Sequence, residues 1–271
     1  MTSTQSPEAP SHRKTCRDVL GLGGVLLWVA CVVPPVSTWT RQYEFVQATQ
    51  FCLFALVVPY LLAVAGPWRW LGLTSNEPFR VDEDGALVTP RRLRLVDRWA
   101  RAKEQRDGHA RVIVLLIVFM VQTIAWRSSP VVDALLRHPW ITTVESIALV
   151  SAGTLFWLEL VESPPFHPSA PRPYRIGASA VAMWTVWVLA YLMAMAPKPW
   201  YHGFGHLPHR LFSFAADQQV ATGVMWFIAA GVFLPVVFSN LYRWLQSEED
   251  PDEELYQLIR KNRSQGFFGT R

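Results

Sequence analysis

The stretch DQQVATGVMWFIAAGVFLPVVFSNLY, residues 217–242, sets the fold class of this chain. Its apolar part is longer than the about 20 helical residues that the hydrocarbon core of a bilayer requires, so it predicts a membrane-spanning helix. One acid and two amides, Asp217, Gln218 and Gln219, stand directly in front of the apolar run. They could cap the helix, or they could belong to a polar site at the membrane surface.

The composition of the chain also indicates a membrane protein. Charged residues make up 17% of the chain and hydrophobic residues 51%, whereas soluble domains carry about 25% charged residues. A mean hydropathy of +0.17 is low for a pure bundle, so sizeable polar segments must accompany the spans. The cysteines form no CxxC pair and give no sign of a disulfide framework.

Six apolar stretches are long enough to cross, or nearly cross, a bilayer. The expected spans are residues 19–36, 45–65, 112–126, 140–161, 176–196 and 219–242. The third is the shortest, because about 15 residues cover only about 22 Å at a helical rise of about 1.5 Å. The flanking Arg111 and Arg127 could extend it by snorkelling to the membrane surface. The sequence thus predicts an all-α, polytopic membrane helix bundle of about six transmembrane helices.

The distribution of Lys and Arg predicts how the bundle is oriented. The N-terminal tail, the loops 67–111 and 162–175 and the residues after 242 together carry 20 of these residues, and the opposite segments carry 5. Because basic residues concentrate on the cytoplasmic side, both termini are expected there. A polytopic chain with this bias fits a bacterial plasma (inner) membrane.

The chain divides into three parts along its length. Residues 1–17 are expected to form a cytoplasmic tail, residues 18–245 the transmembrane bundle, and residues 246–271 a second cytoplasmic tail. In the second tail, DPDEEL (250–255) provides an N-cap, a first-turn proline and a capping-box acid, so a short helix should start there.

The basic cytoplasmic loop, residues 67–111, contains two local signals. Short alternating runs around an Asp-Gly pair at 79–88 predict a hairpin. Residues 90–111 place Leu95, Trp99 and Ala102 at helical spacing among basic residues, which predicts an amphipathic helix. We expect this helix to lie on anionic lipid headgroups. The alternative is a docking surface for a partner protein.

Polar side chains gather at the predicted outer ends of the second, fourth and sixth spans. An acid within a span usually faces the bundle interior or water. We therefore predict a polar cup at the outer surface that either hands on a cation or holds a partner subunit. Its members are Asp217, Gln218, Gln219, Glu145, Gln50 and Gln47. The simpler interpretation of Asp217 is a cap on its own helix.

Two other classes of function remain open. A small transporter or channel for a cation or proton would use Glu145 and Glu159 as intramembrane acids. These lie about 21 Å apart by helical rise, and Ser151 and Thr154 would have to bridge them. A structural docking protein would instead use residues 90–111 and the acidic tail as contact surfaces.

Histidines on the predicted outer side are candidate metal ligands. In HGFGHLPH (202–209), glycine and proline indicate a loop, and loop histidines can converge on a metal. The candidates are His138, His202, His206 and His209. The chain contains no Walker loop, GxGxxG, HExxH or GxSxG pattern and no evident nucleophile–base pair, so an enzyme is not expected. Topology accounts for the basic excess, so nucleic-acid binding is not expected either.

Four stretches in order resemble the CtaG-like cytochrome c oxidase assembly proteins. They are TQFCLFALVVPYLLAVAGP (49–67), HPWITTVESIALVSAGTLFW (138–157), KPWYHGF (198–204) and DQQVATGVMW (217–226) followed by an apolar run and RWLQSEEDPDEEL. Together they cover roughly residues 45–250, and the Asp-Gln-Gln…Met-Trp element is the most specific. The resemblance implies an integral membrane protein that helps to assemble a haem-copper cytochrome c oxidase. It would aid copper-site maturation or subunit assembly at the outer face, with oxidase subunits as partners and copper as the cofactor.

This chain departs from the family pattern at two positions. Where the family has His after Gln in the second span, this chain has Phe51, with Gln47 one turn earlier on the same face. Where the family commonly has Glu-His in the fourth span, this chain has Glu145-Ser146. Imidazole suits copper, and substitutes nearby are Cys52, Met225, His138 and the 202–209 histidines; Cys52 and Met225 are otherwise packing residues. The sequence predicts a divergent member that keeps the scaffold without those two ligands.

Overall fold

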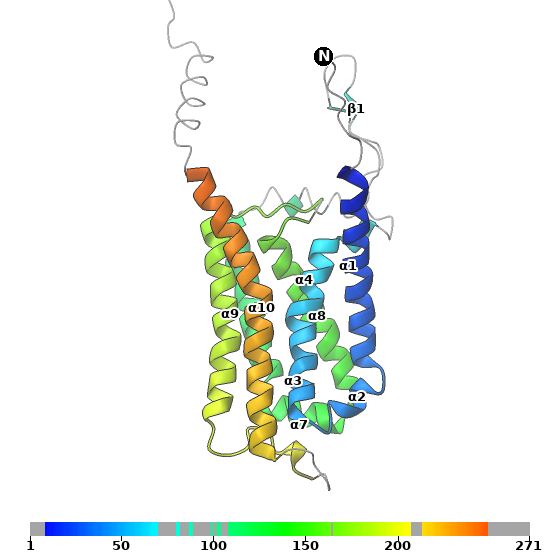
Figure 1. The fold of residues 1–271 in the computed structure, drawn as a ribbon, viewed down its shortest axis with the longest axis vertical. Coiled ribbons are helices and arrows are strands. Elements are labelled where there is room, and N and C mark those ends of the chain that lie inside the picture. Colours follow the sequence, from blue (N-terminus) through cyan, green and yellow to red (C-terminus); the bar gives the residue numbers. More distant parts are fainter. Residues whose placement is uncertain are drawn as a thin grey trace, which may run out of the picture.

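The computed structural model of the protein describes residues 9–69, 80–81, 87–88, 99, 102–103, 108–163, 165–206 and 213–248. Within them, six helical segments are long and apolar enough to cross a membrane, and they form a bundle (Figure 1). They are α1 (Ala9–Val32), α3 with its continuations η1 and α4 (Glu44–Ala65), α6 (Gly108–Trp126), α8 (Pro139–Leu160), α9 (Arg172–Met195) and α10 (Phe214–Glu248). The predicted six-span, all-α fold is confirmed.

The bundle has two distinct ends (Figure 1). One end, which we call the terminal end, holds the start of α1 and the finish of α10. The opposite, distal end holds the short helices α2 (Val36–Trp39), α7 (Ser129–Arg137) and η3 (Gly203–His206). The charge count assigns the terminal end to the cytoplasm and the distal end to the outside. That orientation stays a prediction.

Span boundaries follow from local chemistry. The first span ends at Val32, earlier than expected, because Pro34 and Pro35 follow and neither has a backbone N–H for a helical bond. The third span has 19 residues, more than expected, because its helix already begins at Gly108. The sixth begins at Phe214, so that Asp217 lies within its first turn.

The basic loop is described only in part. Strands β1 (Arg80–Val81) and β2 (Leu87–Val88) pair antiparallel, which confirms the predicted hairpin at 79–88. Of the predicted amphipathic helix, only residues 99, 102–103 and 108–111 are described, so that prediction as a whole lies outside the described residues. The predicted helix at 250–255 also lies outside them.

The second span changes its winding halfway along. It consists of α3 (Glu44–Cys52), a π-helical turn η1 (Leu53–Val57) and α4 (Val58–Ala65). The turn precedes Pro59, whose ring cannot supply a helical N–H, and single π turns are a common response in long helices. A Cβ at Gly153 of α8 would lie 2.7 Å from Pro59 Cγ and 3.1 Å from the Ala55 oxygen. The fourth span can therefore approach the second this closely only because it carries glycine there.

Aromatic side chains fill the centre of the bundle. Phe119 of α6 stacks on Phe156 of α8, with ring centres 5.0 Å apart, and Trp157 of α8 stacks on Phe233 of α10 at 4.9 Å. Tyr60 of α4 meets the edge of Trp157 at 5.1 Å. Around this core, α10 packs on α9 and α3, and α1 packs on α4.

Candidate functional site

A buried arginine organises the distal end. Arg127 follows α6 directly, and none of it is accessible. Its guanidinium carbon lies 4.9 Å from the ring centre of Tyr201 and 5.5 Å from that of Phe51, and it donates a hydrogen bond to Gln47 Oε1. Its second terminal nitrogen lies 3.7 Å from Met193 Sδ. The expectation that Arg127 snorkels to the surface was therefore wrong, because amide, thioether and aromatic faces replace its water inside the bundle.

Tyr201 fixes the position of that arginine. Its hydroxyl donates a 2.9 Å hydrogen bond to the carbonyl oxygen of Arg127, and the residue is 1% exposed. Burial raises the pKa of the Tyr201 phenol, so the hydroxyl stays protonated and remains a donor. The same loop is tied to α7, because Gly203 N–H donates to Asp133 Oδ1 at 3.0 Å. A Cβ at Gly203 would lie 2.5 Å from Leu136 Cδ1 and 2.9 Å from Asp133 Oδ1, so a larger residue would have to displace these side chains.

Asp217 caps the second span, although it lies in the first turn of the sixth. Its two carboxylate oxygens accept hydrogen bonds from the backbone N–H groups of Glu44 and Phe45, each at 3.0 Å. These are N–H groups of the first turn of α3, which the helix itself leaves unpaired and whose N-cap residue Tyr43 provides no side-chain bond. The N-terminus of α10 is instead capped by Ser213, whose hydroxyl accepts from Ala216 N–H at 3.3 Å. The sequence suggested a cap on the sixth span, and the bonds described here run from Asp217 to the second span.

The two neighbouring amides diverge. Gln218 is buried, accepts from the N–H of Trp200 at 2.9 Å and donates to the carbonyl of Met193 at 2.6 Å, so it closes the end of α9. Gln219 is exposed on the outside of the bundle and does not join Asp217 and Gln218. Gln50 is buried, and its amide donates to the Cys31 carbonyl of α1 at 2.7 Å. This hydrogen bond joins the first and second spans.

Glu145 and Gln47 face the arginine cluster. Glu145 of α8 is 1% exposed, and the positive charge of Arg127 acts on its carboxylate. Its Oε1 atom, like Gln47 Nε2 and Arg127 Nε, has no hydrogen-bond partner in the described part of the chain. Of the predicted cup residues, Gln47 and Glu145 therefore face Arg127, while Asp217 and Gln218 lie at the same end of the bundle. The prediction of the cup did not include Arg127, because an arginine that directly follows an apolar run is ordinarily expected at the membrane surface.

A second polar cluster lies at the terminal end. Glu159 of α8 is 1% exposed, and its Oε1 accepts from Arg111 Nε at 2.8 Å and lies 3.1 Å from Lys103 Nζ. Arg111 also donates to Glu159 Oε2 at 3.1 Å and to Ser169 Oγ at 2.7 Å. Like Arg127, Arg111 turns inward instead of snorkelling. Burial lowers the pKa of Lys103 from its ordinary value of 10.5, although Glu159 acts in the opposite direction.

The section between the two clusters is apolar. Phe156 and Trp157 of α8 occupy it, and both are fully buried. Thr154 donates to the Val150 carbonyl at 2.6 Å, and Ser151 faces the outside. A proton relay from Glu145 to Glu159 would require Ser151 and Thr154 to bridge the two acids, and neither side chain lies in a position to do so.

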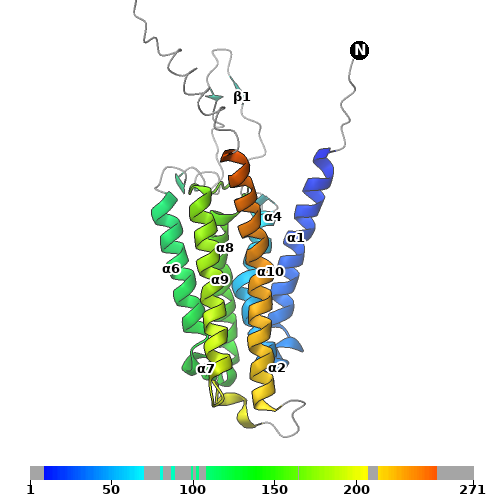
Figure 2. The ribbon, with the colours of Figure 1, turned by 60° about the vertical axis from the view of Figure 1, so that its left-hand side comes forward.

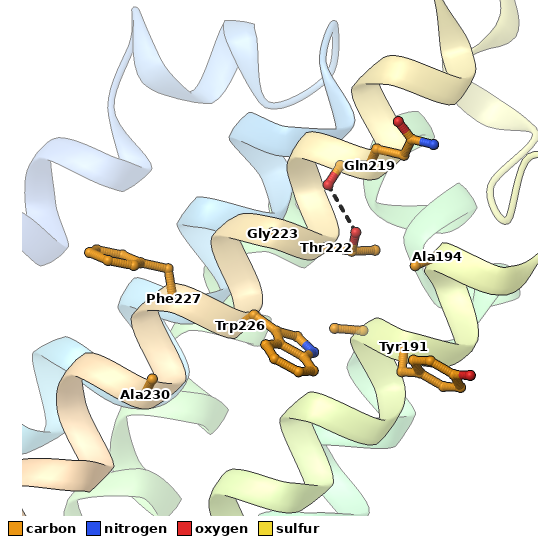
Figure 3. Close-up of a pocket in the computed structure, with 9 residues that line it drawn as sticks. Tyr191, Ala194, Gln219, Thr222, Gly223, Trp226, Phe227 and Ala230 are labelled. Carbon is orange, nitrogen blue, oxygen red and sulfur yellow. Dashed lines mark hydrogen bonds between the residues drawn. The ribbon is translucent and has the colours of Figure 1, made fainter.

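A groove of about 570 Å³ runs along the outside of α9 and α10 (Figure 3). Its floor contains small residues, and Gln219, Thr222 and Trp226 follow one another along α10 with Tyr191 across from them. At its inner end, the indole rings of Trp187 and Trp226 stack with centres 4.6 Å apart. Each indole N–H donates to the carbonyl of the other tryptophan, at 3.2 and 3.3 Å, so the groove has a fixed shape.

The sequence matches a known protein family over most of its length. The model of the cytochrome c oxidase caa3 assembly factors matches residues 7–247, which includes all six spans. The chain belongs to this family. No curated protein and no solved structure matches it. The expected resemblance is confirmed, and the distal and terminal clusters are features of a caa3 assembly factor.

The residues of this assembly factor do not suit a bound copper ion at the distal cluster. The guanidinium of Arg127 lies over Phe51, at the position where the resemblance implied an imidazole ligand, and a fixed positive charge repels a cation. Cys52 and Met225 are fully buried, whereas His138 and His202 are exposed. The side chain of His206 and all of His209 lie outside the described residues. Among the residues described, no group of three or more His, Cys, Asp or Glu could hold a metal.

Proposed function

We propose that this protein acts as a non-catalytic scaffold in the assembly of a haem-copper oxidase in a bacterial plasma membrane. It would hold an oxidase subunit rather than carry copper. The observation that carries the proposal is the use of the distal polar groups. The side chains of Asp217, Gln218 and Gln47 already bond within the chain, and the partner of Gln47 is a buried cation, Arg127.

We propose the α9–α10 groove as the contact surface for a transmembrane helix of that subunit. Helices associate closely in lipid where small residues let the backbones approach, and the floor of the groove contains Ala190, Ala194 and Gly223. The Trp187–Trp226 pair holds α9 and α10 at a fixed spacing, so a partner helix finds the groove already formed. The exposed amide of Gln219 offers a hydrogen bond at its distal end.

Filling the groove tests this function. A Cβ at Gly223 meets nothing within 4 Å, so Gly223→Leu occupies the groove without disturbing the chain itself. We expect this variant to lower the amount of assembled oxidase about fivefold, the factor that about 1 kcal/mol produces. Haem absorbance and oxidase activity of membranes measure the oxidase, and an immunoblot measures the variant.

Gly231→Leu is the matched control. It lies on the same helix, also meets nothing within 4 Å and does not line the groove. Normal oxidase levels in both variants would contradict the groove as a contact surface. Equal losses in both would assign the effect to α10 in general. Copper bound one-to-one by purified protein under reducing conditions would contradict the scaffold role in favour of copper transfer.

A further inference from the structure

A cavity of about 340 Å³ opens at the terminal end between α1, α4, α9 and α10. Three arginines from three helices line it: Arg17 of α1, Arg175 of α9 and Arg243 of α10. One carboxylate, Glu162, accompanies them, so the lining carries an excess of two positive charges. The cavity is separate from the distal cluster and the α9–α10 groove, and of its lining Arg175 also acts electrostatically on Lys103 of the Glu159 cluster.

The arginines are only partly engaged by the protein. The side chain of Arg17 makes no hydrogen bond or ion pair with any residue that the structure describes. Arg243 lies 3.5 Å from Glu162, and both side chains are 58% exposed, which makes a weak surface pair. Arg175 uses two of its nitrogens to hold the carbonyls of Ala170 and Pro168, so its place is fixed by the loop before α9.

The rest of the lining combines polar and apolar groups. Near the arginines, Ser239 and Asn240 of α10 provide further polar atoms. Below them, Tyr60 and Val64 of α4 and Val236 of α10 form an apolar wall that continues into the hydrocarbon-spanning part of the bundle. A ligand that fits both parts has an anionic head and an apolar body.

The cavity lies where the bundle separates. Helix α1 packs on α4, and α10 packs on α9 and α3. Figure 2 shows α1 leaning away from α10 toward the terminal end. The cavity between them is lined from both sides, by Arg17 and by Arg243, near the terminal-end limits of the apolar spans Thr15–Val32 and Phe214–Gln246. Lipid headgroups lie beside the ends of membrane-spanning segments.

We propose that this cavity binds an anionic phospholipid of the leaflet at the terminal end. Arg17 and Arg243 donate to its phosphate, Arg175 faces the phosphate from the fixed loop, and the start of an acyl chain lies along Tyr60 and Val64. Arginine suits this role because its planar fork matches phosphate oxygens. By the charge count, this is the cytoplasmic leaflet.

The test compares phosphatidylglycerol with phosphatidylcholine, each added to the full-length protein in detergent. Phosphatidylglycerol should raise the temperature of unfolding more than phosphatidylcholine does. In the double variant Arg17→Gln/Arg243→Gln, the apparent affinity for phosphatidylglycerol should fall roughly 25-fold. Each basic residue at a lipid surface contributes about 1 kcal/mol, and 1.4 kcal/mol is about tenfold.

A second double variant, Arg41→Gln/Arg137→Gln, is the matched control. It removes the same charge from exposed arginines outside the cavity and should keep the phosphatidylglycerol effect. Equal effects of the two lipids on the wild type, or equal losses in both double variants, would overturn the proposal. Inorganic phosphate that reproduces the full stabilisation would also overturn it, in favour of a soluble anion. Photo-crosslinking of labelled phosphatidylglycerol to wild-type protein should mark α1 and α10, and marking elsewhere would contradict the site.

Discussion

At the distal end the bundle buries a cation, Arg127, against an amide, a thioether and two aromatic rings. At the terminal end it buries an anion, Glu159, between two cations. Neutral polar groups can replace water around a guanidinium, whose charge is delocalised and weakly hydrated. A carboxylate is a compact charge, and it is held here by direct ion pairs. A single substitution therefore has different consequences at the two ends: at the terminal end it can leave buried cations without a counter-charge, and at the distal end it removes the cation itself.

The largest expected effect is at the terminal end. Glu159→Gln leaves the buried Lys103 and the partly buried Arg111 without their shared counter-charge, and we expect it to lower the free energy of unfolding by about 3–5 kcal/mol. Unfolding of the purified protein by a denaturing detergent measures this. Glu162→Gln removes an exposed acid from the same end and should cost at most about 1 kcal/mol. Similar losses in both variants would show that Glu159 is not the centre of the cluster.

Arg127→Met tests the distal end and should cost about 2–3 kcal/mol. It removes two desolvated cation–π contacts and leaves the Gln47 carbonyl oxygen buried without a donor. Arg127→Lys keeps the charge but loses the planar stacking, so it should restore only part of the stability. Full stability of the lysine variant would mean that charge alone, and not the aromatic sandwich, holds this end together.

Asp217→Ala should cost about 1–2 kcal/mol, because the first N–H groups of α3 lose their acceptors. Cellular oxidase and the protein's own membrane level should then fall in parallel. Gln219→Ala, two residues further along, removes an exposed amide and should leave the protein's level unchanged. A loss of oxidase at a normal level of the Asp217→Ala protein would assign Asp217 a direct role in assembly.

The smallest effect concerns pH at the terminal cluster. The pKa of Lys103 is lowered on folding, so the folded state releases this proton before the unfolded state does. Stability should therefore rise with pH in the alkaline window between the lowered pKa and the ordinary value of 10.5. Denaturation across this window should show the rise in the wild type and in Lys198→Met, but not in Lys103→Met. A fall in wild-type stability would reverse the sign and contradict the burial of Lys103.

The six spans could be predicted because each is a local property, a long apolar run bounded by charge or proline. The grouping of Asp217, Glu145 and Gln47 at one end was also predictable, since topology alone brings those span ends together. The role of Arg127 was not, because its partners come from three separate segments of the chain. The available signal was the pair Gln47 and Phe51, one turn apart, which presents an acceptor and a ring on one face.

The hydrogen-bond partners of Asp217 could not be predicted from the sequence either. Sequence places it at the start of α10, where a cap on its own helix is the ordinary expectation. Ser213 accepts a hydrogen bond from the first turn of α10, and the Asp217 carboxylate accepts from α3. The π-helical turn before Pro59 and the close contact between Pro59 and Gly153 likewise depend on how the second and fourth spans pack. The sequence of either span alone does not predict this packing.

The bond from Asp217 to Glu44 joins residues 173 positions apart. Chains emerge N-terminus first at about 5–20 residues per second, so the second span waits roughly 10–35 s for the carboxylate that completes it. Until then the backbone N–H groups of Glu44 and Phe45 lack this acceptor. A chain that stops before the sixth span therefore leaves the start of its second span without this cap, although the missing residues lie far away in the sequence.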